Sequence, residues 1–153
     1  MKISETKIKF DQKNVESSYI ISCSYDVKCI KPGNVNYLSG HPDTDIDDFV
    51  KSYEVTSNMI TSPNLSLGQR IFKCVESTKE AVDTNTNLGI ILLCSVFIQS
   101  LLADEKYTLS EATKAIIMDA SQQDVTDVCN AISLADPGGL GLHESYDVRS
   151  RPD

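Results

Sequence analysis

The sequence predicts an all-α protein, a single helical bundle of about six helices with polar loops rich in Gly and Pro gathered into one site. Apolar residues recur at helical spacing through most of the chain. Strand-like alternation is confined to the first ten residues, and Gly and Pro fall mainly between the helical stretches. The 153 residues fit one domain, residues 1–153, which is long enough to bury a core without disulfides.

The first three predicted helices are amphipathic. In the ranges 15–30 and 45–60, apolar residues fall largely on one stripe, the pattern of a helix that covers a core. The range 67–82 repeats this pattern, and Ser66 stands before it as a candidate N-cap. We therefore expect three helices, each with one buried face.

The remaining three predicted helices differ in character. The range 88–103 is the most apolar part of the chain and is predicted to lie in the core. The residues Thr108 to Glu111 read T-L-S-E, a capping box that starts a fifth helix running to residue 120. The range 124–135 is the sixth, with Val125, Val128, Cys129 and Ile132 on one face.

Charge and hydropathy exclude several classes of function. The net charge of −8 and the pI near 4.7 argue against general binding of nucleic acid or of an anionic membrane. The first residues lack the apolar core of a signal peptide. The run 88–103 is too short to span a bilayer, and Ser95, Gln99 and Ser100 interrupt it. A cytoplasmic location without membrane contact is predicted.

The five cysteines carry no metal or redox motif. None forms a C-x-x-C pair, and no cluster of ligands suited to zinc accompanies them. Each falls in a stretch that reads as helical, so we expect small buried thiols in a reducing compartment.

Three loops carry more polar groups than a reversal of the chain requires, and the first is KPGNVNYLSGHPDTD, residues 31–45. Its Pro-Gly pair, with Gly33, forces a turn and lets the backbone approach a ligand closely. Lys31 suits a phosphate as a point charge. Asp43 and Asp45 suit Mg²⁺ or proton transfer, but they also suit capping of the next helix. Both interpretations stay open.

The second loop is NTNLG, residues 85–89, directly before the apolar helix. One asparagine at this place is explained as an N-cap. Two asparagines, Asn85 and Asn87, flanked by threonines and followed by Gly89, exceed what one helix start needs. A helix N-terminus also offers free amides to an anion. We expect one asparagine to cap and the other, Asn87, to contact a ligand.

The third loop is ADPGGLGLHESYDVR, residues 135–149. Its glycines expose backbone amides that can form a nest for an anion. Alone this is a weak signal, because the loop lacks the spacing of a Walker motif and the strand context of a dinucleotide fold. Polar side chains follow the glycines: His143, Glu144, Asp147 and Arg149.

Taken together and in order, the motifs KPGNV, HPD, NTNLG before an apolar helix, and PGGLG followed by DV resemble the triphosphoribosyl-dephospho-CoA synthase family. The resemblance covers residues 22–149. It implies an all-helical fold and a transferase that moves the triphosphoribosyl group of ATP to the 2'-hydroxyl of 3'-dephospho-CoA with release of adenine. Such enzymes make the prosthetic-group precursor of citrate lyase and malonate decarboxylase.

The resemblance also implies roles for individual residues. Four side chains are expected to contact phosphates or ribose: Lys31, Asn34, Asn85 and Asn87. The backbone near Gly33 and of Gly138, Gly139 and Gly141 is expected to approach the nucleotide. Asp43 and Asp147 are expected to bind Mg²⁺ or to handle protons, and the general base stays open among Asp43, His41 and Asp147.

The resemblance is to the N-terminal part of the family, whose members normally continue well past the PGGLG segment. We therefore expect a fragment, a short homologue, or a chain that forms a homo-oligomer or takes the missing C-terminal half from a second polypeptide. A competing hypothesis is a nucleotide- or phosphosugar-binding module without catalysis. A third is a helical interaction subunit in which the loops are only structural.

Overall fold

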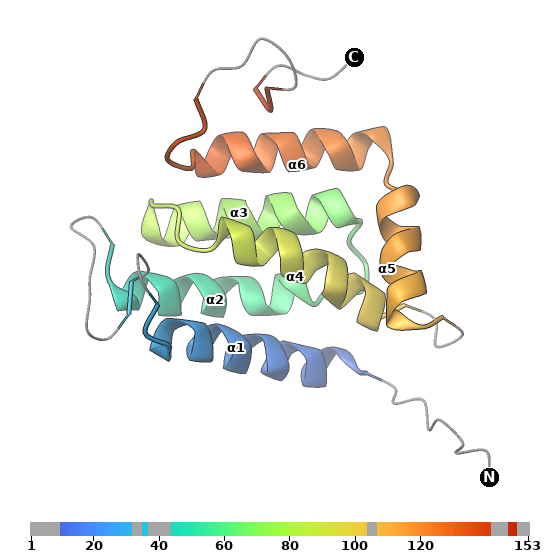
Figure 1. Ribbon diagram of the computed structural model, residues 1–153, viewed down its shortest axis with the longest axis horizontal. Helices are drawn as coiled ribbons and strands as arrows, with labels where there is room; N and C mark the ends of the chain where they lie inside the picture. Colours follow the sequence, from blue (N-terminus) through green and yellow to red (C-terminus); the bar gives the residue numbers. More distant parts are fainter. Residues whose placement is uncertain (1–9, 32–34, 37–43, 104–106, 142–146, 150–153) are drawn as a thin grey trace.

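The fold is a bundle of helices, shown by the computed structural model in Figure 1. The structure describes residues 10–31, 35–36, 44–103, 107–141 and 147–149. Within these ranges it contains six helices: α1 (Gln12–Lys28), α2 (Ile46–Ile60), α3 (Leu67–Val82), α4 (Leu88–Leu101), α5 (Leu109–Met118) and α6 (Gln122–Ala135). The prediction of an all-α bundle of about six helices is confirmed.

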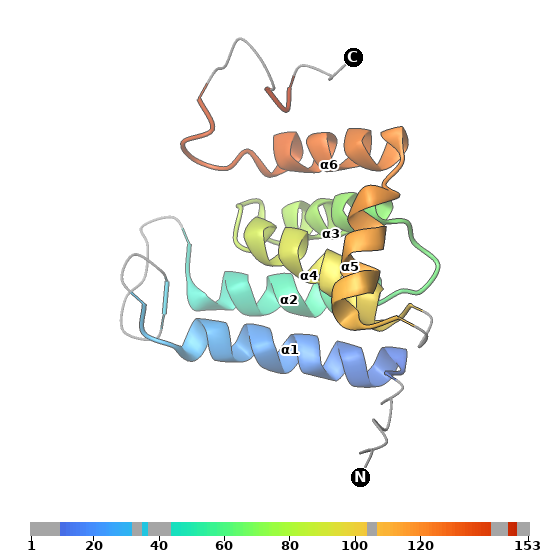
Figure 2. The ribbon, with the colours of Figure 1, turned by 45° about the vertical axis from the view of Figure 1, so that its right-hand side comes forward.

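Helix α3 is the centre of the bundle. It packs against α2 on one side, against α6 on another, and against α4. Helix α1 covers the outer face of α2, and α5 turns across one end of the bundle to pack against α4 (Figures 1 and 2). The core cluster draws on α1, α2, α3, α4 and α6.

The predicted helix starts follow the expected capping chemistry. The side chain of Asp45 caps α2, and Ser66 caps α3. Thr108 and Glu111 form the capping box predicted for α5. The sixth helix begins earlier than predicted, because Ser121 is its N-cap, with Asp124 as the third residue of the helix.

The buried face of α2 was not predicted. Instead of a purely apolar stripe, it buries the hydroxyl residues Ser52, Thr56 and Ser57 beside Ile60. Ser52 and Thr56 satisfy their hydroxyls on the carbonyl four residues earlier, at 2.6 and 2.8 Å. Small hydroxyl side chains therefore line much of the contact between α2 and its neighbours. Ile60 of the predicted stripe is fully buried, whereas the bulky apolar residues of the stripe at positions 46–53 are half-buried.

Helices α3 and α6 meet without a side chain between them at Gly68. A Cβ added at Gly68 would lie 2.5 Å from the Cα of Asp124 and 2.7 Å from its carbonyl oxygen. The Asp124 carboxylate accepts from the Gly68 amide at 2.8 Å and from the Ser66 hydroxyl at 2.6 Å. Its other oxygen accepts from the amide and the hydroxyl of Ser121. One carboxylate thus joins the starts of two helices.

The cysteines only partly follow the prediction of buried thiols. Cys23 and Cys74 are buried as predicted, but Cys29 ends α1 and is exposed. Within these ranges no helix is long and apolar enough to cross a membrane. Large apolar side chains are exposed on α4 and α5, including Leu93, Phe97 and Met118. A second copy or a partner chain on this face stays a prediction.

The lowered pKa of Asp124 makes the free energy of unfolding depend on pH. Burial alone raises its pKa, but hydrogen bonds from the Ser121 and Ser66 hydroxyls and from the Gly68 and Ser121 amides lower it to about 2. Because the folded value lies below the ordinary value of 3.8, this carboxylate stabilises the fold above about pH 4. That contribution is lost as the pH falls from about 4 to about 2.

We expect Asp124→Asn to lower the free energy of unfolding by about 2 kcal/mol at pH 7, and the difference from the parent to shrink below pH 4. Urea denaturation at several pH values measures this. Asp127→Asn is the control, since the hydrogen bond that the Asp127 carboxylate accepts in the described ranges comes from exposed Gln123 and does not join two helices. A difference for Asp124→Asn that stays constant from pH 7 to pH 2.5 would contradict the assignment.

Candidate functional site

The helix ends that flank the three polar loops lie at one end of the bundle. The end of α1, the start of α2, the turn between α3 and α4, and the end of α6 all lie there (Figures 1 and 2). This follows from the alternating direction of the helices. The described residues of this end are Lys31, Asp45, the range 83–88 and the range 136–141.

Part of the predicted site lies outside the described residues: Gly33, Asn34, His41, Asp43, His143 and Glu144. Their roles stay predictions. Lys31 is described, and its ammonium group forms an ion pair with Asp26 of α1. Its side chain is 36% exposed, so it remains accessible at the edge of this end.

Two lysines, Lys79 of α3 and Lys51 of α2, contact the C-terminal end of α3 and the start of the turn to α4. Asp83 caps the helix in the left-handed conformation, with φ of 52°. The Lys79 ammonium lies 3.0 Å from both the carbonyl oxygen and the carboxylate of Asp83. The Lys51 ammonium donates to the Ala81 carbonyl at 2.7 Å. Two cations therefore lie at the negative end of the α3 dipole.

Asn85 has the role of a cap. Its Oδ1 accepts from the Leu88 amide at 3.3 Å, in the first turn of α4. The next residue, Thr86, ties the turn to α2, because its hydroxyl lies 2.6 Å from that of the buried Ser52. The side chains of Asn85 and Thr86 thus each make a hydrogen bond that stabilises the fold.

Asn87 is placed differently. It occupies the N-cap position of α4, but its side chain makes no capping hydrogen bond. The side chain is buried, with only 5% of the residue exposed, and its Oδ1 accepts from the Thr78 hydroxyl at 3.2 Å. Its Nδ2 is buried without a hydrogen-bond partner in the described part of the chain. A buried donor without an acceptor costs about 1–3 kcal/mol, so this group needs an explanation.

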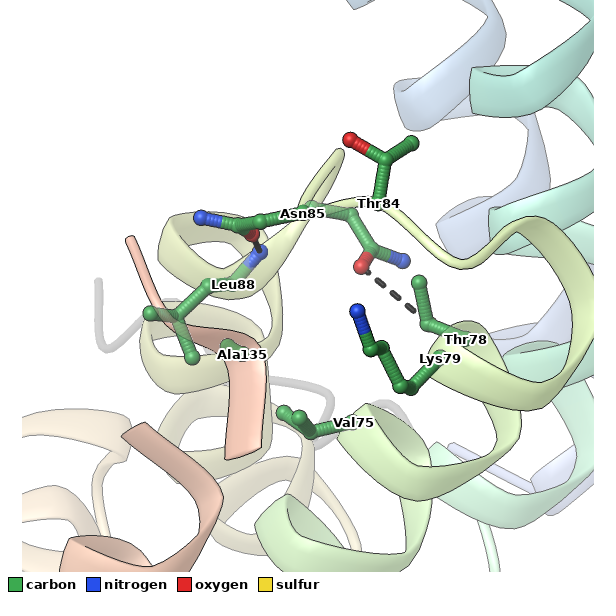
Figure 3. Close-up of a pocket in the computed structure, with 8 residues that line it drawn as sticks. Val75, Thr78, Lys79, Thr84, Asn85, Leu88 and Ala135 are labelled. Atoms are coloured by element: carbon green, nitrogen blue, oxygen red, sulfur yellow. Dashed lines mark hydrogen bonds between the residues drawn. The ribbon is translucent and has the colours of Figure 1, made fainter. Parts of the chain in front are cut away.

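The Asn87 side chain borders a small cavity between the α3–α4 turn, α3 and the end of α6. Its volume is about 10 Å³, close to the space of one water molecule. Figure 3 shows Thr84 and Asn85 on one side, Val75, Thr78 and Lys79 of α3 on another, and Ala135 of α6 nearby. The end of α6 leads directly into the glycine-rich third loop, so this cavity joins two of the three loops.

The described part of the third loop turns at its glycines. Gly139 and Gly141 have φ of 81° and 61°, in the left-handed region that favours glycine. A Cβ added at Gly138 or Gly139 would meet nothing within 4 Å, so packing does not demand glycine there. Gly138 and Gly139 are exposed, which leaves their backbone accessible to a ligand.

Arg149 connects Asp147 to Gly141 of the third loop. The Arg149 guanidinium donates to the Gly141 carbonyl at 2.6 Å and lies 3.6 Å from the Asp147 carboxylate. The same carboxylate accepts from the Arg149 amide at 2.9 Å. Gly141 and Asp147 are therefore brought together.

The described residues do not by themselves form a metal centre. Among them there is no group of three or more His, Cys, Asp or Glu side chains that could hold an ion. Asp147 is the described candidate ligand, and its side chain is 10% exposed beside Arg149. The other candidate, Asp43, lies outside the described ranges, so binding of Mg²⁺ stays a prediction.

Sequence reasoning missed three polar residues of this site: Thr78, Lys79 and Lys51. Thr78 and Lys79 lie in the last two turns of α3, where a polar residue is ordinarily solvated. Lys51 is thirty positions from the carbonyl that it contacts. Only the antiparallel packing of α2 on α3 brings it there, and no local pattern encodes that contact.

The comparison with protein families agrees with the loop motifs. A family model described as ATP:dephospho-CoA triphosphoribosyl transferase, CitG, matches residues 12–153, a range that contains all three loops. Neither the comparison with curated proteins nor that with solved structures finds a match. The family expected from the motifs is therefore confirmed, and the chain belongs to the ATP:dephospho-CoA triphosphoribosyl transferase family of transferases.

Proposed function

We propose that this chain transfers the triphosphoribosyl group of ATP to the 2'-hydroxyl of 3'-dephospho-CoA and releases adenine. The product would be a prosthetic-group precursor for enzymes of the citrate lyase or malonate decarboxylase type. The family supplies the two substrates. The structural observation that supports a ligand site is the buried Nδ2 of Asn87, a donor that has no acceptor among the described residues, at the end of the bundle that carries the loops.

The proposed reaction is a substitution at the anomeric carbon of the ATP ribose. The 2'-oxygen of the acceptor forms a bond to this carbon, and the bond from the carbon to the adenine nitrogen breaks. The electron pair leaves with adenine, which takes up a proton, while the acceptor hydroxyl gives its proton to a base. A nearby carboxylate would stabilise the positive charge that develops on the sugar in the transition state. Asp43, His41 and Asp147 remain the candidates for the base.

The α3–α4 turn offers donors to the phosphates or the ribose. The Asn87 Nδ2 lacks an acceptor among the described residues. The Leu88 amide is capped by Asn85, and the next first-turn amides of α4 have no partner within the helix. Gly89 in that turn is exposed, and a Cβ added there would meet nothing within 4 Å, so a ligand can approach the backbone. Lys51, whose ammonium donates to a neutral carbonyl, adds positive charge on a chain of net charge −8, whereas the charge of Lys79 is paired with that of Asp83.

The size of the cavity limits how ATP would use it. A volume of about 10 Å³ admits one oxygen-sized group and not a phosphate or a ring. We therefore expect one ligand oxygen to reach Asn87 while the rest of the nucleotide lies across the bundle end, toward Gly138 and Gly139. Asn85 would support this arrangement as the cap of α4.

A second candidate function is a nucleotide- or phosphosugar-binding module, or a partner subunit, without independent catalysis. It is favoured by the distribution of the described residues, since the donors gather at the α3–α4 turn while Asp147 lies with Arg149 and Gly141. Binding without turnover distinguishes this candidate from the transferase. We place the protein in the cytoplasm, where ATP and the acceptor are available.

If the chain is a transferase, we expect it to release one adenine per molecule of product when the purified chain is incubated with ATP, Mg²⁺ and 3'-dephospho-CoA. Chromatography measures adenine, and mass spectrometry measures the product. Replacing the acceptor by CoA, whose ribose carries a 3'-phosphate, tests acceptor choice. ATP binding with no adenine, with the chain alone and with a candidate second subunit, would refute the transferase and support the binding module.

Replacement of Asn87 by Asp tests the donor role of its Nδ2. Asn87→Asp keeps the acceptor for Thr78 but exchanges the donor for a negative oxygen at the same position. We expect ATP to bind at least tenfold more weakly by isothermal titration calorimetry, because one hydrogen bond becomes a repulsion.

Asn130→Asp, on the exposed face of α6, is the matched control and should bind ATP like the parent. Thermal denaturation of both variants shows whether the titrations compare folded proteins. If Asn87→Asp is folded and binds ATP with the affinity of the parent, Asn87 has only a structural role.

A further inference from the structure

The outer side of helix α4 is apolar and exposed. Leu93 and Phe97 are 66% and 50% exposed, and their spacing of four residues places them one above the other on this side. The hydroxyl residues Ser95 and Ser100 of the same helix are buried instead. A helix at a protein surface ordinarily has the opposite distribution, with its polar side toward water. The outer side of α4 therefore has the character of a surface that packs against protein.

Helix α5 extends this surface. Ile117 and Met118 are 55% and 73% exposed. Together with Phe97 they line an open groove of about 670 Å³, where α5 packs against α4 (Figures 1 and 2). The other residues that line the groove are Leu109, Ser110, Thr113 and Lys114. We call the surface made by Leu93 and the residues of this groove the α4–α5 face.

The α4–α5 face approaches the size of a stable contact between proteins. A large side chain has about 150–250 Å² of surface, so its five apolar side chains, each about half exposed or more, present on the order of 500 Å². The polar residues of the groove add to this area, and a stable contact buries about 800 Å² on each partner. An apolar patch of this size on a soluble protein ordinarily marks a site of interaction.

The distribution of charge makes this face suitable for contact with a second copy. The chain has a net charge of −8, so two copies repel each other unless they meet where acidic side chains are scarce. None of the 14 residues of α4 is charged. Among the described residues that line the groove, Lys114 is the one charged residue. Two copies that meet through this face therefore bring no carboxylates of these residues together.

The shape of the face also suits a second copy. In a two-fold contact both copies use the same surface, so that surface must contain a protrusion and a hollow that fit each other. Leu93 is the protrusion, because it is the more exposed residue of the α4 pair and lies one turn before Phe97. The groove that begins at Phe97 is the hollow. A partner of another kind would need only one of these two features.

We infer that the chain forms a two-fold dimer through the α4–α5 face. Leu93 of each copy enters the groove between α4 and α5 of the other copy, where Lys114 lies at the wall. This contact is separate from the proposed transferase site, since Asn87 is buried beside α3 at the start of α4. The inference does not rest on the proposed function.

Sedimentation equilibrium of the full chain tests the dimer. We expect a mass twice that of the 16.8 kDa chain, which falls toward the single chain on dilution. Leu93→Lys should weaken self-association at least tenfold, because it places an ammonium group opposite Lys114 of the other copy. Leu93 is already exposed, so this variant should keep the helical circular dichroism of the parent.

Ile21→Lys is the matched control. Ile21 is 55% exposed on α1 and lies two residues from buried Cys23, hence on the opposite side of that helix. Its variant should dimerise like the parent. A parent that is monomeric at every concentration, that forms species larger than a dimer, or that binds a different polypeptide through this face while remaining monomeric would overturn the proposal. Equal weakening by Ile21→Lys and Leu93→Lys would also overturn it.

A second substitution tests how the two copies are oriented. Adding Lys114→Glu to Leu93→Lys places opposite charges where the two copies meet, so the double variant should associate at least tenfold more tightly than Leu93→Lys. Lys114 is exposed, so its replacement does not bury a charge in the single chain. A double variant that associates as weakly as Leu93→Lys would refute the placement of Leu93 in the groove of the other copy.

Discussion

The contact between α3 and α6 at Gly68 is the constraint on which the arrangement of the bundle depends. The absence of a side chain at Gly68 lets the backbone of α6 approach, and the buried carboxylate of Asp124 then satisfies donors from both helices. Because α3 also packs against α2 and α4, fixing α3 on α6 sets the position of four helices. The far end of α3, and the turn that follows it, are positioned as a consequence.

Buried polar contacts connect the packed helices to the turn between α3 and α4 and so fix the position of this turn. Ser52 on α2 joins Thr86 in the turn, and Thr78 on α3 donates to Asn87. Lys51 and Lys79 satisfy carbonyl groups at the end of α3. The turn is therefore held from two helices, and the Asn87 amide is kept in place with an Nδ2 that has no partner in the part of the chain that the structure describes. Such preorganisation reduces the cost of ordering the site when a ligand binds.

Much of the fold was predictable because its signals are local. Helical spacing and the caps Ser66 and Thr108 lie within a few residues of the helices that they define. The buried hydroxyl face of α2 was not predictable, because Ser52 and Thr56 become core residues only through packing against neighbours distant in sequence. For the site, the sequence predicted that one asparagine caps and the other does not. The roles of Lys79 and Lys51 depend on tertiary contacts and could not be predicted.

The NMR signals of the Asn87 side-chain NH₂ report whether this amide binds a ligand. We predict that addition of ATP with Mg²⁺ shifts these signals and slows their exchange with water, because the Nδ2 gains an acceptor. The side-chain signals of exposed Asn130 should not move. If ATP binds, as shown by shifts elsewhere, and the Asn87 NH₂ signals keep their positions and exchange rates, Asn87 is not a ligand-binding group.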